Sequence, residues 1–131
     1  MARRASRETA LKVLYAWDIS SVEPMELINS LTEDEEFNVS EPDEFFGQLV
    51  NGVLENQAQL DEIISNHAAE WDFDRISVVE RNILRIALYE ILFIEENPFA
   101  VVVDEAITIA KIYGAENSYR FINGVLDKIK I

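Results

Sequence analysis

The sequence predicts an all-α fold, a single domain of six to seven helices over residues 1–131. Apolar residues recur at intervals of three and four almost throughout, and no stretch alternates apolar with polar residues for the length of a strand. Capping residues and breaks divide this pattern into segments of ordinary helix length. With 49% hydrophobic residues, the chain is also rich enough in apolar side chains to build one core.

The first two expected helices span about residues 5–18 and 24–31, separated by the pair Ser20–Ser21. Three arginines lie at or before the start of the first helix: Arg3, Arg4 and Arg7. The helix dipole disfavours cations at that end, so their placement favours a reason other than folding. The acidic run 33–36 then reads as a solvated loop.

A third helix is expected to start at the cap sequence Ser40-Glu41-Pro42-Asp43 and to continue to about Ala69. Residues 71–75 form a connector or a short helix. Ser77 and Glu80 are spaced as a capping box, which opens a helix from residue 78 to about 95. This helix is apolar on nearly all sides, so we expect it to be the central, buried one.

The last two helices are expected over residues 98–113 and 119–130. Asn97–Pro98 marks the boundary before the first of them, because proline suits the first helical position. Gly114 is a plausible left-handed C-cap, and Ser118 is the expected cap of the final helix.

Residues 49–55 and 121–127 match in residue type at every position and share Asn-Gly-Val-Leu. A glycine inside a helix costs about 0.5–1 kcal/mol relative to alanine, so both glycines predict close approach of another helix. Two similar helical subdomains in one core would explain the match, and so would chance similarity between amphipathic helices.

The net charge of −14 at first argues against a nucleic-acid partner, but the charges are unevenly distributed. Residues 1–12 hold four cations and one glutamate, residues 13–74 hold sixteen acids and no cation, and residues 75–131 hold seven cations and eight acids. A local basic patch acts within a Debye length of about 8–10 Å. The basic N-terminal segment, residues 1–12, therefore remains a candidate phosphate-binding site.

Catalysis, metal binding and cofactor binding find little support in the residue types present. There is no cysteine, one histidine and no glycine-rich phosphate loop, and the carboxylates of Asp72, Asp74 and Glu80 match no metal-loop spacing. The N-terminus lacks the apolar stretch of a secretory signal, and no apolar run is long enough to span a bilayer. We expect a cytoplasmic binding protein without enzymatic activity and without membrane association.

Binding residues are suggested at both ends of the chain. Arginines in the N-terminal segment can make forked contacts to phosphates, although a merely solvated basic terminus would look the same. Ser118, Phe121 and Asn123 could add stacking and base-edge contacts, and Phe121 by its spacing could equally be core. Arg81 and Arg85 share one helix face and are either ion-paired or RNA-facing.

Several stretches occur together in an order that carries a family resemblance. They are the arginine-rich start running into Ala10-Leu11-Lys12-Val13-Leu14-Tyr15-Ala16-Trp17, then Val79-Glu80-Arg81-Asn82-Ile83-Leu84-Arg85-Ile86-Ala87-Leu88-Tyr89-Glu90, Pro98, Val102-Val103-Asp104-Glu105-Ala106, Ala110-Lys111, Gly114-Ala115-Glu116 and residues 121–127. In these stretches, over essentially its whole length, the chain resembles the bacterial NusB family of transcription antitermination factors.

The resemblance implies two small helical bundles packed crosswise and a role in binding single-stranded boxA RNA together with NusE, a small-subunit ribosomal protein. That heterodimer would join other Nus factors on RNA polymerase and suppress premature termination. The residues implied in the RNA surface are Arg3, Arg4, Arg7, Tyr15, Ser118, Phe121 and Asn123. The resemblance places Glu80 in the contact with the ribosomal protein, with Arg75 and Arg81 nearby.

Two departures from the family pattern bear on affinity. Ala5 and Ser6 interrupt the arginine run, and Asn117 stands where an acidic residue is common. NusB-like modules also occur in ribosomal RNA cytosine methyltransferases, whose catalytic domain is not expected here. A protein-only scaffold for basic partners, or an accessory module in ribosomal RNA maturation, is the alternative function. The sequence leaves open whether the free protein forms a homodimer.

Overall fold

The computed structural model describes residues 3–33, 43–68 and 73–129, and all regular structure within these ranges is helical. The elements are α1 (Arg3–Ser20), α2 (Pro24–Glu33), α3 (Glu44–Glu55), α4 (Gln57–His67), the short 3₁₀ helix η2 (Phe73–Arg75), α5 (Val78–Phe93), α6 (Phe99–Tyr113) and α7 (Ser118–Ile129). The prediction of an all-α fold is confirmed.

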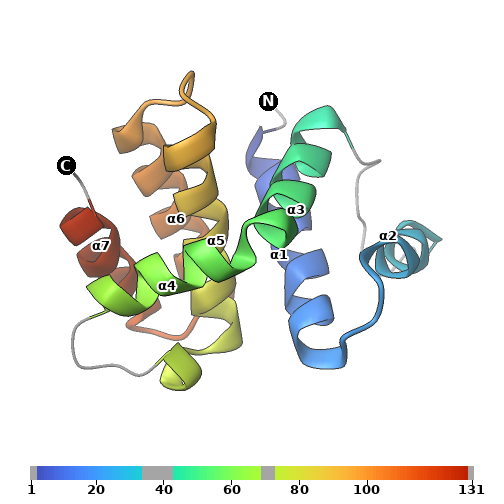
Figure 1. The fold of residues 1–131 in the computed structure, drawn as a ribbon, viewed down its shortest axis with the longest axis horizontal. Coiled ribbons are helices and arrows are strands. Elements are labelled where there is room, and N and C mark those ends of the chain that lie inside the picture. Colours follow the sequence, from blue (N-terminus) through green and yellow to red (C-terminus); the bar gives the residue numbers. More distant parts are fainter. Residues whose placement is uncertain (1–2, 34–42, 69–72, 130–131) are drawn as a thin grey trace.

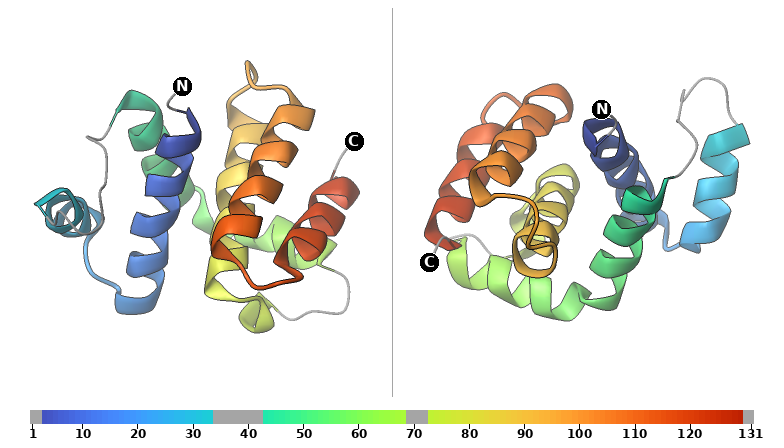
Figure 2. Two further views of the ribbon diagram at one scale, coloured as in Figure 1. Left: turned by 180° about the vertical axis from the view of Figure 1, so that it is seen from behind. Right: turned by 90° about the horizontal axis from the view of Figure 1, so that it is seen from above.

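The helices form two groups that meet along α1, α3 and α5. Helices α1, α2 and α3 lie on one side and α5, α6 and α7 on the other, while α4 continues from α3 and crosses α5 (Figure 1). Two further views show the same division (Figure 2). Two small bundles packed crosswise were expected, and this arrangement confirms them.

Helix α5 is the central helix, as its apolar sequence predicts. The side chains from Asn82 to Leu88 are all buried, and α5 contacts α1, α3, α4, α6 and α7. The antiparallel α1 runs along it, so that Arg7 near the start of α1 meets Glu90 near the end of α5. At the other end Asp18 meets Arg81. The two groups are therefore joined along the full length of α1.

The expected continuous helix from Ser40 to Ala69 is wrong. Helix α3 ends at Glu55, and Asn56 leaves the helical region with φ −114° and ψ 15° before α4 begins. Both the backbone and the side-chain amide of Asn56 donate to the carbonyl oxygen of Gly52, at 3.1 and 2.8 Å. Asparagine ends helices in this way because its side chain competes for backbone groups. The turn lets α3 pack on α1 and α5 while α4 packs on α5 and α7.

The start of that segment also differs in detail. Asp43 is the N-cap of α3, and its carboxylate accepts from the amide of Phe46 at 2.7 Å. The predicted cap Ser40 lies outside the described residues. The capping box at Ser77 and Glu80 is confirmed, with both of its hydrogen bonds present. Residues 71–75 were expected to be a connector or a short helix, and η2 occupies their described part.

Gly114 is not the left-handed cap that the sequence suggested, because its backbone is extended (φ −90°, ψ −179°). Glycine is needed here for space: a Cβ atom would lie 2.7 Å from the carbonyl oxygen of Ala110 and from the Cβ of Ser118. Ser118 is the first residue of α7 rather than its cap, and its hydroxyl accepts from the amide of Ala115 at 3.0 Å.

The two matching segments end up in different helix groups, at the end of α3 and within α7. Gly52 lies directly under the ring of Tyr89, which a Cβ atom would overlap, so α3 and α5 approach closely there. A Cβ atom on Gly124 would meet nothing within 4 Å. The prediction of a close approach is therefore right for Gly52 and wrong for Gly124.

Among the described residues, no helix is long and apolar enough to cross a membrane.

Candidate nucleic-acid and partner interface

Arg3 and Arg4 both lie at the exposed start of α1, where the sequence placed a phosphate-binding site. About half of each side chain is exposed, 49% for Arg3 and 53% for Arg4. The guanidinium of Arg3 donates to Asn97 and Glu96 and lies 4.4 Å from the centre of the Phe45 ring. Both arginines therefore remain within reach of a ligand, although each already has acidic or polar neighbours.

Arg7 is placed differently, because it is buried. Its side chain is only 6% exposed, and its Nε and Nη2 donate to the two carboxylate oxygens of Glu90 at 2.8 and 2.7 Å. Glu90 also accepts from the side-chain amide of Asn97 at 2.9 Å. The guanidinium is thus engaged by Glu90 inside the protein, and little of the Arg7 side chain is exposed.

The exposed arginines line a shallow groove between the start of α1 and the start of α6. We call it the N-terminal groove; it is lined by Arg3, Arg4, Asn97, Val101 and Glu105, with Arg7 at its base and Glu8 at its rim. Arg4 donates to both oxygens of Glu105, at 2.8 and 3.1 Å. These hydrogen bonds hold the pKa of Glu105 below its usual value, against the opposing effect of its partial burial. Glu105 is therefore ionised at neutral pH.

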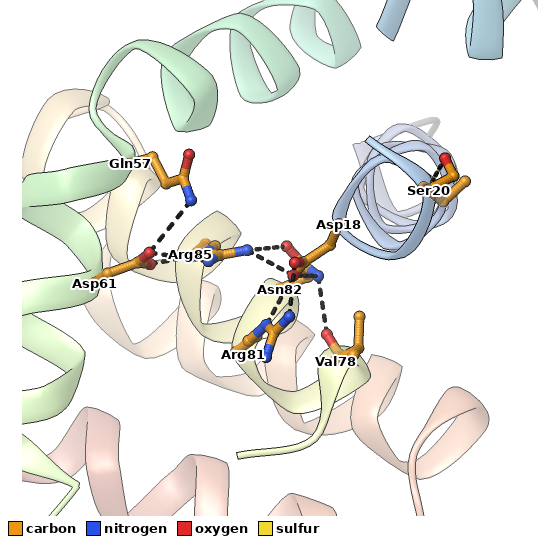
Figure 3. A network of polar contacts seen from close by, with 9 residues as sticks. Asp18, Ser20, Gln57, Asp61, Val78, Arg81, Asn82 and Arg85 are labelled. Atoms are coloured by element: carbon orange, nitrogen blue, oxygen red, sulfur yellow. Dashed lines mark hydrogen bonds and ion pairs between the residues drawn. The ribbon is translucent and has the colours of Figure 1, made fainter. Parts of the chain in front are cut away.

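A buried polar network joins α1, α4 and α5 at the opposite end of α1 (Figure 3). Arg85 is at its centre, donating to both oxygens of Asp61 at 2.7 and 2.9 Å and to Asp18 at 2.9 Å. Arg81 donates to both oxygens of Asp18 at 2.7 and 2.6 Å. Of the two alternatives for Arg81 and Arg85, ion pairing inside the protein is the one that the structure supports.

The charge of Asp18 is stabilised by this network. Burial raises the pKa of Asp18, but the hydrogen bonds from Arg81 and Asn82 and the charges of both arginines outweigh it and lower the pKa below its usual value. The same contact raises the pKa of Arg81. Arg81, predicted near the partner-protein contact, thus has its guanidinium directed at Asp18, with only 17% of its side chain exposed.

Tyr15 lies in an apolar groove between α1, α2 and the start of α5. The α1 groove, as we name it, is lined mainly by Leu11, Tyr15, Ile19, Leu27, Val79 and Tyr113. Tyr15 and Ile19 are exposed there. Lys12 also borders the groove, with its Nζ 5.8 Å from the centre of the Tyr113 ring. Tyr15 is thus set among apolar side chains, three helical turns from Arg4.

Glu80 lies in a second depression, together with residues that the sequence had assigned to RNA. This Glu80 hollow is lined by Arg75, Ile76, Glu80, Asn117, Ser118 and Phe121. Ser118 is buried and Phe121 partly buried, whereas Asn123 is exposed on α7, about 200° further round the helix than Phe121. The structure brings Ser118 and Phe121 to Arg75 and Glu80, not to Arg3 and Arg4.

Of the carboxylates considered as a metal site, Asp74 and Glu80 lie among the described residues. Asp72 lies outside the described residues, and among those described no group of three or more potential metal ligands occurs.

Comparisons with known proteins agree with this arrangement over nearly the whole chain. The sequence model of the NusB family matches residues 4–130. The chain belongs to the NusB family. It is 45% identical to the transcription antitermination protein NusB of Bacillus subtilis over 130 residues, covering 99% of this chain and 95% of the relative. It is 48% identical to the NusB of Elusimicrobium minutum, covering 98% and 92%.

A solved structure of NusB extends the comparison to three dimensions. In a crystal structure of the antitermination factors NusB and NusE in complex with double-stranded RNA, the matching chain has a TM-score of 0.83 and 32% identity to this chain, covering 97% of this chain and 94% of the other. This chain is thus similar in fold to a NusB protein that was solved in complex with NusE and RNA.

Sequence reasoning missed three residues of the N-terminal groove and the α1 groove. Lys12 was counted in the basic segment but not assigned to a site, and Glu105 and Asn97 were not considered as partners of the arginines. One signal could have pointed to Glu105 in advance, since it interrupts the apolar pattern of the helix over residues 98–113. Its arginine partner, 101 residues earlier in the chain, has no local signature.

Proposed function

We propose that this chain is a transcription antitermination factor, which binds boxA-type single-stranded RNA together with the ribosomal protein NusE and acts with other Nus factors on RNA polymerase. It does so as a cytoplasmic binding protein and not as an enzyme. The observation that carries the proposal is the likeness to NusB proteins over the whole chain, including a structure of NusB with NusE and RNA.

The RNA surface begins at the N-terminal groove and continues along α1. Arg4, Lys12 and Tyr15 fall on one face of this helix, because the spacings of eight and eleven residues return to within about 80° of the same direction. The guanidinium groups of Arg3 and Arg4 suit phosphate oxygens, and Lys12 adds a charge further along. Tyr15 offers a ring on which a base can stack.

The protein partner fits the α1 groove and the Glu80 hollow. Val79 lines the groove and Glu80 lines the hollow, and since these residues are consecutive the two depressions adjoin. Apolar side chains flanked by an acidic one match a partner that presents apolar groups beside basic ones, as ribosomal proteins do. Tyr15 and Lys12 then lie where the RNA surface and the partner surface meet, which accounts for joint binding of the two ligands.

A protein-only scaffold remains the second candidate function. Three of the arginines, Arg7, Arg81 and Arg85, are engaged inside the protein, and Arg4 is paired with Glu105. The cationic surface of the described residues is therefore smaller than the sequence suggests. A scaffold of this kind would bind the basic partner through its acidic surface without RNA.

RNA titration separates the two candidates. We expect the double variant Arg3→Ala with Arg4→Ala to weaken binding of a boxA-type oligonucleotide about 10- to 30-fold, because two charge-assisted contacts are lost. The slope of log K against log salt becomes shallower by about 1.4, since each single-strand phosphate contact contributes about 0.7. Fluorescence anisotropy at 50–200 mM salt, with and without NusE, measures both quantities.

Lys111→Ala with Lys128→Ala, which removes two exposed cations outside the groove, is the charge-matched control and should leave affinity and slope nearly unchanged. A scrambled oligonucleotide tests sequence preference. Binding that is equal for both oligonucleotides and insensitive to the two arginines would rule out the antitermination proposal and leave the scaffold.

Glu80 gives a separate prediction for the partner surface. Glu80→Lys should weaken binding of NusE about 10-fold or more, because a like charge then faces the basic partner. Glu80 also accepts from the amide of Ser77 at 3.3 Å in the capping box, so the variant should lose about 0.5–1 kcal/mol of stability through the cap. Isothermal titration calorimetry with NusE measures the first effect and urea unfolding the second.

Glu80→Gln is the matched control, since glutamine keeps the capping hydrogen bond and removes only the charge. It should bind NusE with an affinity between those of the wild type and Glu80→Lys. If Glu80→Lys binds NusE normally, or if loss of affinity is accompanied by loss of helical circular dichroism, Glu80 acts as a helix cap and not as a partner contact.

A further inference from the structure

Arg4 and Glu105 form an asymmetric pair in the N-terminal groove. Arg4 is half exposed, whereas the side chain of Glu105 is only 19% exposed. The fork of Arg4 is fully directed at Glu105, through Nε to Oε2 and Nη2 to Oε1. An incoming phosphate therefore meets an arginine that already donates from Nε and Nη2 to a carboxylate of this chain.

A second cation, Arg7, lies close to Glu105. Nη1 of Arg7 lies 4.0 Å from Oε2 of Glu105, while the other nitrogens of Arg7 are bound to Glu90. If Arg4 turns away toward a ligand, Glu105 keeps a positive neighbour inside the groove. Exchange of Glu105 for a phosphate as the partner of Arg4 is thus feasible without leaving an isolated carboxylate.

Arg3 is held less firmly than Arg4. Its acidic neighbour Glu96 is 71% exposed and lies 3.4 Å away, which is a long, solvated contact. Such exposed pairs hold their partners only weakly. The two exposed arginines of the groove therefore differ: Arg3 donates to Asn97 and Glu96 without a bidentate carboxylate partner, whereas Arg4 must first give up such a partner.

We propose that Glu105 acts as an internal competitor for RNA phosphate at Arg4 and thereby sets the affinity of the N-terminal groove. This inference rests on the proposed RNA-binding function and concerns the regulation of that same site. It assigns to Glu105 a restraining effect: its carboxylate occupies Arg4 in the free protein, and a phosphate oxygen replaces it when RNA binds. The chain by itself then binds RNA weakly, and tight binding depends on further contacts, such as those of a partner protein.

The test uses the full chain and the boxA-type oligonucleotide by itself. Glu105→Gln keeps the size of the side chain and removes its charge, and we expect it to bind the RNA about 2- to 5-fold more tightly than the wild type. In a double-mutant cycle with Arg4→Ala the gain should vanish, because there is no longer an arginine to release. Glu105→Asp keeps the charge on a shorter side chain, which places the carboxylate further from Arg4. It should therefore show a smaller gain in RNA affinity.

Glu8→Gln is the matched control, since Glu8 lies in the same groove and accepts from the hydroxyl of Tyr113 instead of Arg4. Equal gains from Glu8→Gln and Glu105→Gln, or a gain that persists with Arg4→Ala, would show a general charge effect and overturn the inference. So would unchanged or weaker binding by Glu105→Gln when circular dichroism shows a folded protein. If Glu105→Gln does not fold, Glu105→Asp decides by the same criteria. Failure of the wild type to bind RNA would instead contradict the proposed function.

Discussion

Replacing Arg85 with alanine is expected to lower the free energy of unfolding by about 3–5 kcal/mol, the largest effect of any single change in the α1–α4–α5 network. The side chain of Arg85 is 2% exposed and donates to Asp18, Asp61 and Asn82. Without it, two partly buried carboxylates lose their shared cation and lie close together in a region of low polarity. Urea unfolding followed by circular dichroism measures the loss.

Arg81→Ala is the appropriate control, because it removes an arginine from the same network but leaves Asp18 with Arg85 and Asn82. We expect it to cost less than Arg85→Ala, about 1.5–3 kcal/mol as for a hydrogen bond to a charged group, because Asp18 keeps two donors. The replacement Arg85→Met combined with Arg81→Met, Asp18→Asn and Asp61→Asn should recover part of the stability, since all four charges of the network are then removed together. Equal losses for Arg81→Ala and Arg85→Ala would mean that the network is solvated and that Arg85 is not its centre.

Replacing Arg7 with alanine is expected to have an effect of similar size, about 3–5 kcal/mol, on stability. The reason is the buried carboxylate of Glu90, which would keep only the hydrogen bond from Asn97. The double variant Arg7→Met with Glu90→Leu removes both charges and should return to within about 1 kcal/mol of the wild type. Thermal and urea unfolding of the single and double variants provide the comparison.

The same double variant decides whether Arg7 contacts RNA. If Arg7 does not contact RNA, the affinity of the folded double variant for the boxA-type oligonucleotide should be within about 3-fold of the wild-type affinity. The variant Arg3→Ala with Arg4→Ala should differ by more than that. If the double variant is stable but its affinity for RNA falls more than 10-fold, Arg7 contributes to the RNA surface. Stability and affinity must therefore be measured on the same preparation.

Local features of the fold were predictable because their causes lie within a few residues of one another. The capping box of Ser77 and Glu80 and the apolar sequence of α5 depend only on neighbouring positions, and both were found as expected. The break at Asn56 was missed because residues 42–69 keep an apolar repeat through it. What ends α3 is the return of the Asn56 side chain to Gly52, after which the chain leaves α1 and packs against α5 and α7.

Which arginines face solvent was not predictable in the same way. Arg7 and Arg4 are three residues apart on one helix, yet Arg7 is buried and Arg4 is half exposed. Their acidic partners are 83 and 101 residues away in the sequence, so no local pattern predicts this difference. Arg85 did carry a usable signal. It stands among Ile83, Leu84, Ile86 and Leu88 in a helix expected to be buried on all sides, where a cation has to be paired.

The antiparallel pairing of α1 with α5 also constrains the order of events during synthesis. Helix α1 leaves the ribosome first, but the partners of Asp18 and Arg7 on α5 are translated 63 to 83 residues later. Until then α1 can pack only against α2 and α3, and the side of α1 that meets α5, with its internal arginine, stays uncovered. The geometry of the N-terminal groove is thus acquired late in translation, once α5 and α6 have emerged.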